Sequence, residues 1–336
     1  MDVSSVSPVR GIEEQFPQSS TMTIRESCET SRAASVANIF FNKIAVFGDS
    51  LSDPGNAYSL WHRETAPPYD TLDELLVPDY PYKDHHHYCN GPTWIELFAE
   101  AHKLALSGGP AFAESDGSRA NFAVGRARAR NTKNTDRIDL SGQVDEFLHR
   151  TPGVVPGDTL CVLEIGANDV RDALVSQKDA SSIISEALSE IDQNIEKLYA
   201  RGARKFLVWD IPDIGKTPTL RSLDLLHPGI ADASKELTIA FNTGLKAHII
   251  ALSRLQGIEI AELDVYKTLD QMVANPREYG LRVVDSPCVM PNYSPCYHQN
   301  FDEYLFWDGI HPAEGFHKAV AQEAALLALR DERCMP

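Results

Sequence analysis

Apolar and polar positions along the chain fall into two recurring patterns, short continuous apolar runs and longer stretches with a helical period. The apolar runs predict buried strands over residues 43–48, 121–125, 159–165, 205–209 and 258–263. The helical periods predict helices over residues 92–106, 182–200, 237–255 and 312–329. Because strands and helices alternate, the pattern predicts βαβ units and an α/β fold, a three-layer α/β/α sandwich around about five parallel strands.

Candidate chemistry stands at the end of the first apolar run and near the end of the sequence. The run breaks at Gly48-Asp49 and presents Ser50 at the carboxyl edge of the predicted sheet, where open α/β folds bind ligands. Asp308 and His311 lie three residues apart, before a proline that suits a first helical turn. Ser50 is therefore a candidate nucleophile, His311 a candidate general base, and Asp308 the carboxylate that orients it.

Four blocks of sequence together resemble a known family. Their order is Gly48-Asp-Ser-Leu-Ser52, Asn121-Phe-Ala-Val-Gly125, Gly166-Ala-Asn-Asp169 and Asp308-Gly-Ile-His311. In this order they resemble the SGNH hydrolases, also called GDSL lipases and esterases, and residues 90–96 and 211–218 resemble the larger plant-and-secreted-lipase branch. The similarity runs from about residue 43 to about residue 329. It implies a flavodoxin-like arrangement and an esterase. The Gly-x-Ser-x-Gly elbow of α/β-hydrolases is missing, because position 52 is Ser.

Three donors are candidates for an oxyanion hole. They are the backbone N–H groups of Ser50 and Gly125 and the side-chain amide of Asn168, with Asp169 helping to fix the Asn168 loop. Gly125 lacks a side chain, so its N–H can approach a bound carbonyl oxygen; the alternative is a purely structural turn. The family commonly has a second glycine at the next position, where this sequence has Arg126.

These residues predict a serine esterase that hydrolyses a small-molecule carboxylic ester through an acyl-enzyme. An acyltransferase that uses the same acyl-enzyme is the alternative, and a lipase or phospholipase is another. A catalytically silent binding protein on the same fold is a further alternative. We expect no cofactor and no metal, and the sequence makes no prediction of the oligomeric state.

Charge narrows the choice of partner. The chain has 31 Lys and Arg against 48 Asp and Glu, a net charge of -17, which disfavours nucleic acid and anionic membranes. This charge predicts neutral, soluble esters as substrates. One basic stretch opposes the trend: Arg119, Arg126, Arg128, Arg130, Lys133 and Arg137. This stretch has two possible interpretations: a solvated face of the protein, or a binding site for an anionic group of the substrate.

Residues 53–90 form a long insertion directly after the nucleophile, rich in Pro and aromatic residues. A wall or lid over the site is one interpretation, and a surface excursion packed on its own aromatics is the other. The insertion contains His85-His86-His87. Adjacent side chains of an extended segment point alternately apart, so a metal site is not predicted.

The ends of the chain and the cysteines give weaker signals. Residues 1–38 are polar and predict a flexible extension, followed by a single domain over residues 39–336. The sequence contains no run of eighteen apolar residues, so integral membrane association is not predicted. No signal peptide is recognisable. We therefore expect a cytoplasmic protein, with secretion by another route left open. The family resemblance implies a loop disulfide between Cys288 and Cys296, which a reducing compartment would leave as thiols.

Overall fold

A parallel sheet forms the centre of the computed structural model, which describes residues 39–114, 117–134, 137–294 and 300–330. Its strand order is β2-β3-β4-β5. The strands are β2 (Lys43–Gly48), β3 (Thr159–Glu164), β4 (Lys205–Trp209) and β5 (Glu259–Leu263). All three neighbouring pairs are parallel, so their carboxyl ends share one edge of the sheet.

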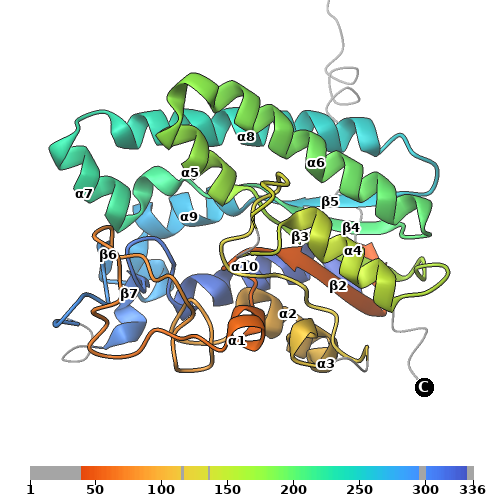
Figure 1. Ribbon diagram of the computed structural model, residues 1–336, viewed down its shortest axis with the longest axis horizontal. Coiled ribbons are helices and arrows are strands. Elements are labelled where there is room, and N and C mark those ends of the chain that lie inside the picture. The colour runs from red at the N-terminus through yellow and green to blue at the C-terminus, as the bar shows by residue number, and fades with distance from the viewer. Residues whose placement is uncertain (1–38, 115–116, 135–136, 295–299, 331–336) are drawn as a thin grey trace, which may run out of the picture. The chain divides into compact units, whose positions relative to one another are not determined.

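Helices cover both faces of this sheet (Figure 1). The α-helices are α1 (Asn56–Trp61), α2 (Trp94–Ala101), α3 (Ala105–Gly108), α4 (Leu140–Arg150), α5 (Ala167–Val175), α6 (Ala180–Ala200), α7 (Pro218–Leu226), α8 (Ile230–Leu252), α9 (Val265–Ala274) and α10 (Glu314–Leu327). Short 3-10 helices span Ala111–Ala113, Gln177–Asp179, Ile214–Lys216, Pro276–Tyr279 and Phe301–Glu303. Two parallel strand pairs lie outside the central sheet: β1 (Ile39–Phe41) with β8 (Ala328–Arg330), and β6 (Val283–Pro287) with β7 (Tyr304–Phe306).

Alternate residues of each strand supply two hydrophobic cores. On β2, Ala45 and Phe47 belong to the core shared with α4, α5, α6 and α8. Ile44 and Val46 belong to the core shared with α2, α9 and α10. Because both faces are covered, β2, β3 and β4 are apolar along most of their length and appear in the sequence as continuous runs, whereas β5 contains the partly exposed Glu259 and Glu262. The predicted three-layer α/β/α sandwich is confirmed.

The segment 121–125 differs from its prediction as a regular strand. It runs beside β2, where Phe122 N donates to Val46 O at 2.8 Å and Val124 N donates to Gly48 O at 3.1 Å. On its other side the Asn56 amide donates to the carbonyls of Asn121 and Ala123, at 2.8 Å each. Ala111 N also donates to Asn121 O at 2.9 Å, so the segment makes isolated bridges on both sides and does not form a regular strand.

The predicted helices also differ at their ends: α8, predicted over residues 237–255, begins at Ile230 and ends at Leu252. The helix expected over residues 92–106 begins at a Thr93–Glu96 capping box but is divided into α2 and α3. Between them Lys103 has a φ of 57°, a left-handed conformation that interrupts a right-handed helix. The last helix ends at Leu327 and continues into β8. The sequence period could not show these breaks because the apolar positions continue across them.

Asp210 joins the end of β4 to the start of α9 and gives the fold a pH dependence. Its Oδ1 accepts the N–H groups of Val265 and Tyr266 at 2.6 and 2.9 Å. Burial, reinforced by the negative charge of Asp264, raises the pKa of Asp210 to about 7. A raised folded pKa means that this group's contribution to stability is complete below pH 4 and is lost as the pH rises through about 7.

We therefore predict that Asp210→Asn stabilises the protein at pH 8 more than at pH 5. Asparagine retains the Oδ1 acceptor for both N–H groups but carries no charge to desolvate. The expected difference between the two pH values is on the order of 1 kcal/mol in the free energy of unfolding. Urea unfolding of variant and wild type at both pH values measures it, and an equal effect at pH 5 and pH 8 would contradict the assigned cause.

Candidate active site

Ser50 lies in the turn that follows β2. Gly48 ends the strand against β3, and a Cβ at this position would lie 2.7 Å from the carbonyl oxygen of Glu164, so only glycine fits. The Ser52 N–H donates to Asp49 O at 3.3 Å and closes the turn around Ser50. The Ser50 residue is 9% exposed, so the turn presents its hydroxyl at the edge of the sheet in a largely enclosed setting.

Asp308 and His311 lie in the loop between β7 and α10. Asp308 Oδ1 accepts the N–H groups of Ile310 and His311 at 2.8 and 2.7 Å, which folds the loop into a tight turn. The same turn is closed by Trp307 N, which donates to His311 O at 2.8 Å. The three-residue spacing therefore lets one carboxylate hold both the backbone and the ring of His311.

The three side chains form one hydrogen-bonded row. His311 Nε2 lies 2.9 Å from Ser50 Oγ, and His311 Nδ1 lies 2.7 Å from Asp308 Oδ2. Because the partner of Nδ1 is a carboxylate, Nδ1 carries the hydrogen and Nε2 is left to accept the serine proton. Residues 261 positions apart are thus placed in the geometry that nucleophilic catalysis needs.

A tyrosine from the insertion completes the surroundings of Asp308. Tyr82 OH donates to Asp308 Oδ2 at 2.8 Å. Its ring packs edge-on against Tyr69 and Trp307, and the residue is only 3% exposed. Burial, together with the neighbouring Asp308 carboxylate, raises the pKa of Tyr82 well above its usual range, so the hydroxyl keeps its proton. Sequence reasoning missed this residue, because the insertion has no periodicity that marks Tyr82 out among its aromatics.

The predicted oxyanion donors differ in availability. Within the described residues, none of the hydrogen bonds takes the Ser50 N–H. Asn168 Nδ2 donates to Asp49 Oδ2 at 3.1 Å and to Ala127 O at 3.0 Å. Gly125 N donates to Asp53 Oδ2 at 2.8 Å, so a carbonyl oxygen could take this N–H only after that bond is broken. Sequence reasoning did not foresee Asp53 as the acceptor.

Two buried carboxyl groups lie directly behind the nucleophile turn. Asp49 N donates to Glu164 Oε2 at 3.2 Å, and the two side chains are hydrogen-bonded to each other. Burial and the charge of Asp49 raise the pKa of Glu164 well above its usual range. Burial raises the pKa of Asp49 as well, and Asp49 Oδ2 accepts the hydrogen bond from the Asn168 amide.

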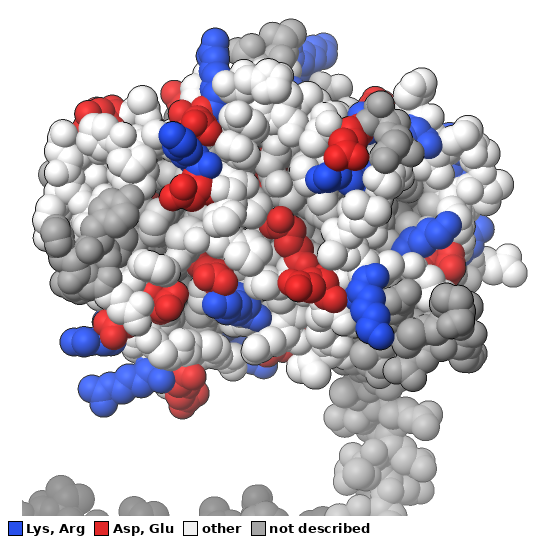
Figure 2. Space-filling view, turned by 90° about the horizontal axis from the view of Figure 1, so that it is seen from below, with Lys and Arg blue, Asp and Glu red and all other residues white. Residues whose placement is uncertain are grey.

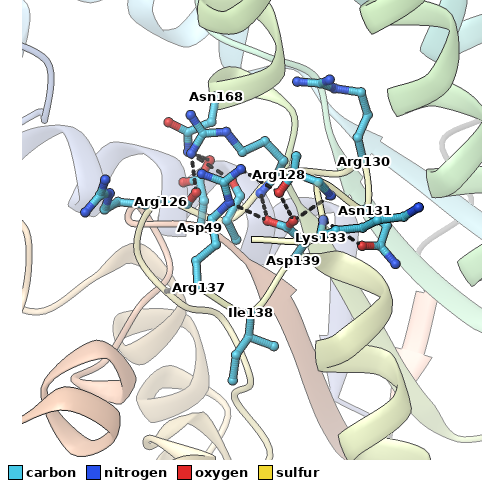
Figure 3. Close-up of polar contacts among 12 residues, drawn as sticks. Asp49, Arg126, Arg128, Arg130, Asn131, Lys133, Arg137, Ile138, Asp139 and Asn168 are labelled. Atoms are coloured by element: carbon cyan, nitrogen blue, oxygen red, sulfur yellow. Dashed lines mark hydrogen bonds and ion pairs between the residues drawn. The ribbon is translucent and has the colours of Figure 1, made fainter. Parts of the chain in front are cut away.

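The basic stretch is largely paired with carboxylates, and Figure 3 shows the contacts of Arg128 and Arg137 with Asp139. The ion pairs are Arg128–Asp172, Arg130–Asp169, Arg130–Asp172 and Arg137–Asp139, at 2.6 to 3.0 Å. Arg126 points away from this group, is half exposed and lies 3.5 Å from Asp79. Arg126 also has a φ of 69°, the left-handed conformation that a glycine adopts without strain. Most of the stretch is thus committed to structure.

The insertion lies against the Asp308 and His311 side of the site. Gly309 N donates to Leu76 O at 2.9 Å, and the Tyr88 ring lies 5.1 Å from the His311 ring, between centroids. Its three histidines turn to different partners. His86 stacks on Tyr58, His87 Nε2 lies 3.1 Å from Glu96, and His85 lies beside His87.

Neither the histidines nor the cysteines give a metal centre among the described residues, where no group of three His, Cys, Asp or Glu is placed to hold an ion. Cys89 and Cys161 are buried thiols. Cys288 is disulfide-bonded, while Cys296 lies outside the described residues, as does the predicted N-terminal extension. Across the described part of the chain, no helix has the length and apolar character that crossing a bilayer requires.

A cavity of about 60 Å³ opens beside Ser50 and His311. Its apolar wall comes from Leu51, Pro212, Leu220, Leu269, Phe306 and Phe316. Its polar lining includes Asn168 and Arg171 of α5, whose first turn begins after Gly166 with a φ of 126°. An apolar pocket beside a nucleophile suits the hydrocarbon part of a bound molecule.

Curated relatives align with most of the chain. A thermolabile hemolysin of Vibrio parahaemolyticus is 25% identical over 303 residues, 84% of this chain and 62% of that protein. A GDSL esterase/lipase of Arabidopsis thaliana is 25% identical over 322 residues, 83% of this chain and 80% of that protein. A phosphatidylcholine-sterol acyltransferase of Aeromonas hydrophila is 23% identical over 331 residues, 85% of this chain and 89% of that protein.

Solved structures give a weaker likeness, limited to the fold. A catalytic mutant of an acetylxylan esterase from Geobacillus stearothermophilus covers 86% of this chain and 95% of its own, with 13% identity and a TM-score of 0.46.

The family model for GDSL-like lipases and acylhydrolases also matches most of the chain. It covers residues 44–324, which include all four sequence blocks and the whole central sheet except Lys43. This extent, with relatives that align over most of the chain, supports a hydrolase that acts on esters. The chain belongs to the GDSL-like lipase/acylhydrolase family.

Proposed function

We propose that the protein is a serine esterase that hydrolyses carboxylic esters through an acyl-enzyme. The observation that carries this proposal is the row from Ser50 Oγ through His311 to Asp308, with contacts of 2.9 and 2.7 Å. Ser50 Oγ attacks the ester carbonyl carbon, and its proton passes to His311 Nε2. When the tetrahedral intermediate collapses, the bond to the alcohol oxygen breaks and His311 returns the proton to that oxygen.

Water completes the cycle by the same route. His311 takes a proton from the water, the new hydroxyl bonds to the acyl carbon, and the acid leaves as Ser50 regains its proton. Asp308 stabilises the imidazolium that forms in both halves. The Ser50 N–H is the first proposed oxyanion donor; the Asn168 amide joins it when it gives up its bond to Asp49 or Ala127, and Gly125 joins it when Asp53 releases its N–H.

Hydrolysis of p-nitrophenyl butyrate, with covalent labelling of Ser50 by a fluorophosphonate probe, tests the proposal. We expect turnover and labelling at Ser50 alone, both unaffected by EDTA. Turnover that survives complete fluorophosphonate labelling would place the chemistry elsewhere.

Acyl transfer to an alcohol is the second candidate, because the aligned Aeromonas hydrophila relative is named as an acyltransferase. The same acyl-enzyme serves both reactions, and only the group that attacks it differs. Adding glycerol to the assay separates them: a new glycerol ester formed in place of free butyrate would identify a transferase.

Asn168→Ala is predicted to lower kcat by roughly 10²- to 10³-fold, the range expected for loss of one oxyanion donor. KM should change little, since the developing negative charge exists only in the transition state. Steady-state kinetics on p-nitrophenyl butyrate measure both constants. A loss confined to KM would show that Asn168 contacts the ground state instead.

Tyr82→Phe is predicted to lower kcat roughly tenfold with little change in KM, because Asp308 loses one donor to its charge and holds the imidazolium less well. Tyr80→Phe is the matched control: Tyr80 belongs to the same insertion, but its hydroxyl contacts Arg63. Equal losses in both variants would trace the effect to the insertion as a whole.

A further inference from the structure

Arg171 brings a positive charge to the wall of the cavity that contains Ser50. It lies in α5 one helical turn after Asn168, so both residues present their side chains on the same face. Arg171 Nη1 donates to Asn168 Oδ1 at 3.2 Å. Arg171, Asn168, Ser50 and His311 all line this one cavity.

This guanidinium has no carboxylate partner. The ion pairs formed within the described residues leave Arg171 out, while Asp172, the next residue, takes both Arg128 and Arg130. Asp49, on the other side, is occupied by the Asn168 amide and the Leu51 N–H. Burial and the positive charge of Arg128 lower the pKa of Arg171, while the more distant carboxylates of Asp172, Asp73 and Asp49 oppose this shift without forming an ion pair with Arg171 among the described residues. Such a group normally occurs with a bound or built-in anion.

The donors left on Arg171 suit a carboxylate. With Nη1 committed to Asn168, the Nε and Nη2 hydrogens remain along one edge of the planar group, where they match the two oxygens of a carboxylate. The other acidic residue of the lining, Asp213, accepts the Gly215 N–H at 3.0 Å and has the charges of Lys216, Asp270 and Lys235 near it. An anion in the cavity is therefore attracted to Arg171 in particular.

The outer surface does not supply this attraction. Figure 2 shows acidic and basic side chains interspersed over the face seen from below, with acidic side chains gathered near its middle. The net charge of -17 repels anions at long range. Recognition of an anionic group thus depends on a local contact inside the cavity.

We propose that the substrate of this site is an ester that carries a carboxylate, which Arg171 binds while the apolar wall holds the hydrocarbon between that carboxylate and the ester. This proposal rests on the proposed esterase function. It departs from the neutral substrate predicted from charge alone, because net charge describes the whole surface while the contact is with one side chain. The carboxylate belongs to the acyl part or to the alcohol part, and two substrate pairs distinguish these sources.

The first pair compares mono-p-nitrophenyl adipate with p-nitrophenyl hexanoate, which share acyl length and leaving group and differ in one terminal carboxylate. The second pair compares 4-(butanoyloxy)benzoate with its methyl ester, which places the charge on the alcohol part. Within one pair, we expect wild-type kcat/KM to favour the anionic member by roughly 10- to 100-fold, the range for a hydrogen bond between charged groups.

Three variants test whether Arg171 causes the preference for the anionic ester. Arg171→Gln should abolish it, and Arg171→Lys should retain part of it because the charge remains. Arg221→Gln is the matched control, since Arg221 is exposed on α7, next to the cavity residue Leu220. It removes the same charge without touching the cavity and should leave the ratio unchanged.

The ratio of kcat/KM for the anionic ester to kcat/KM for the neutral ester distinguishes two roles of Arg171: binding the substrate and positioning Asn168. If Arg171 only positions Asn168, Arg171→Gln lowers both members of each pair equally and the proposal is overturned. Ser50-dependent hydrolysis of the neutral esters without a preference for either anion overturns this proposal alone. Absence of fluorophosphonate labelling at Ser50 overturns the proposed function, and this inference with it.

Discussion

Ser50→Ala is expected to lower kcat/KM for p-nitrophenyl butyrate by roughly 10³-fold or more, with the fold unchanged. The hydroxyl removed is the atom that forms the acyl-enzyme, and no neighbouring group replaces it at 2.9 Å from His311 Nε2. His311→Ala should cost about as much, because the nucleophile and its base act as one unit. Steady-state kinetics and circular dichroism of both variants make the measurement.

Two substitutions of the same residue types elsewhere in the protein serve as controls for this result. Ser59→Ala and His227→Ala remove the same side chains from α1 and from the residue after α7, away from the Ser50 row. Both should retain wild-type kcat/KM. If Ser50→Ala retained a tenth of the wild-type kcat/KM, the assignment of Ser50 as the nucleophile would be wrong.

Asp308→Asn is expected to lower kcat by roughly 10⁴-fold, the loss associated with forcing a catalytic histidine into the wrong tautomer. Asp308 Oδ1 is held by two backbone N–H groups, so the new amide nitrogen is directed to the Oδ2 position. At that position the amide nitrogen, which is a donor, would face Tyr82 OH and His311 Nδ1, which both donate to Asp308 in the wild type. The ring would have to turn its hydrogen to Nε2, which then could not accept the Ser50 proton.

The pH dependence of kcat and a control variant test the explanation given for Asp308→Asn. Raising the pH does not repair a tautomer, so the loss should persist from pH 6 to pH 9. Asp302→Asn, an exposed change in the same segment, should have little effect. A loss in Asp308→Asn below tenfold would mean that Asp308 serves the loop rather than the imidazole.

The fold was predictable because burial leaves a direct trace in the sequence. A strand with both faces covered is apolar at most positions, which made β2, β3 and β4 visible as runs, whereas β5 contains Glu259 and Glu262. Residues 121–125 gave the same trace, yet the Asn56 side chain occupies the carbonyls that a regular strand would share. A long-range side-chain contact of this kind has no local pattern.

The candidate site was predictable to the extent that it lies at ends of strands. Ser50 and Asn168 follow β2 and β3, whose carboxyl ends meet at one edge, and His311 follows β7. Their catalytic roles stay predictions. The partners that adjust these groups could not be predicted, because Tyr82 reaches Asp308 across 226 positions and Asp53 reaches Gly125 across 72. Such contacts depend on how loops pack, which sequence period does not encode.

Pairing of β1 with β8 has a consequence for synthesis on the ribosome. Ile39 lies opposite Ala328, so the first described strand waits for almost three hundred further residues before it finds its partner. Since His311 and Asp308 are also made late, a nascent chain that already displays Ser50 cannot yet activate it. Edge strands without partners are prone to wrong pairing. Between translation of β1 and release of β8, the nascent chain therefore carries a strand whose native partner does not yet exist.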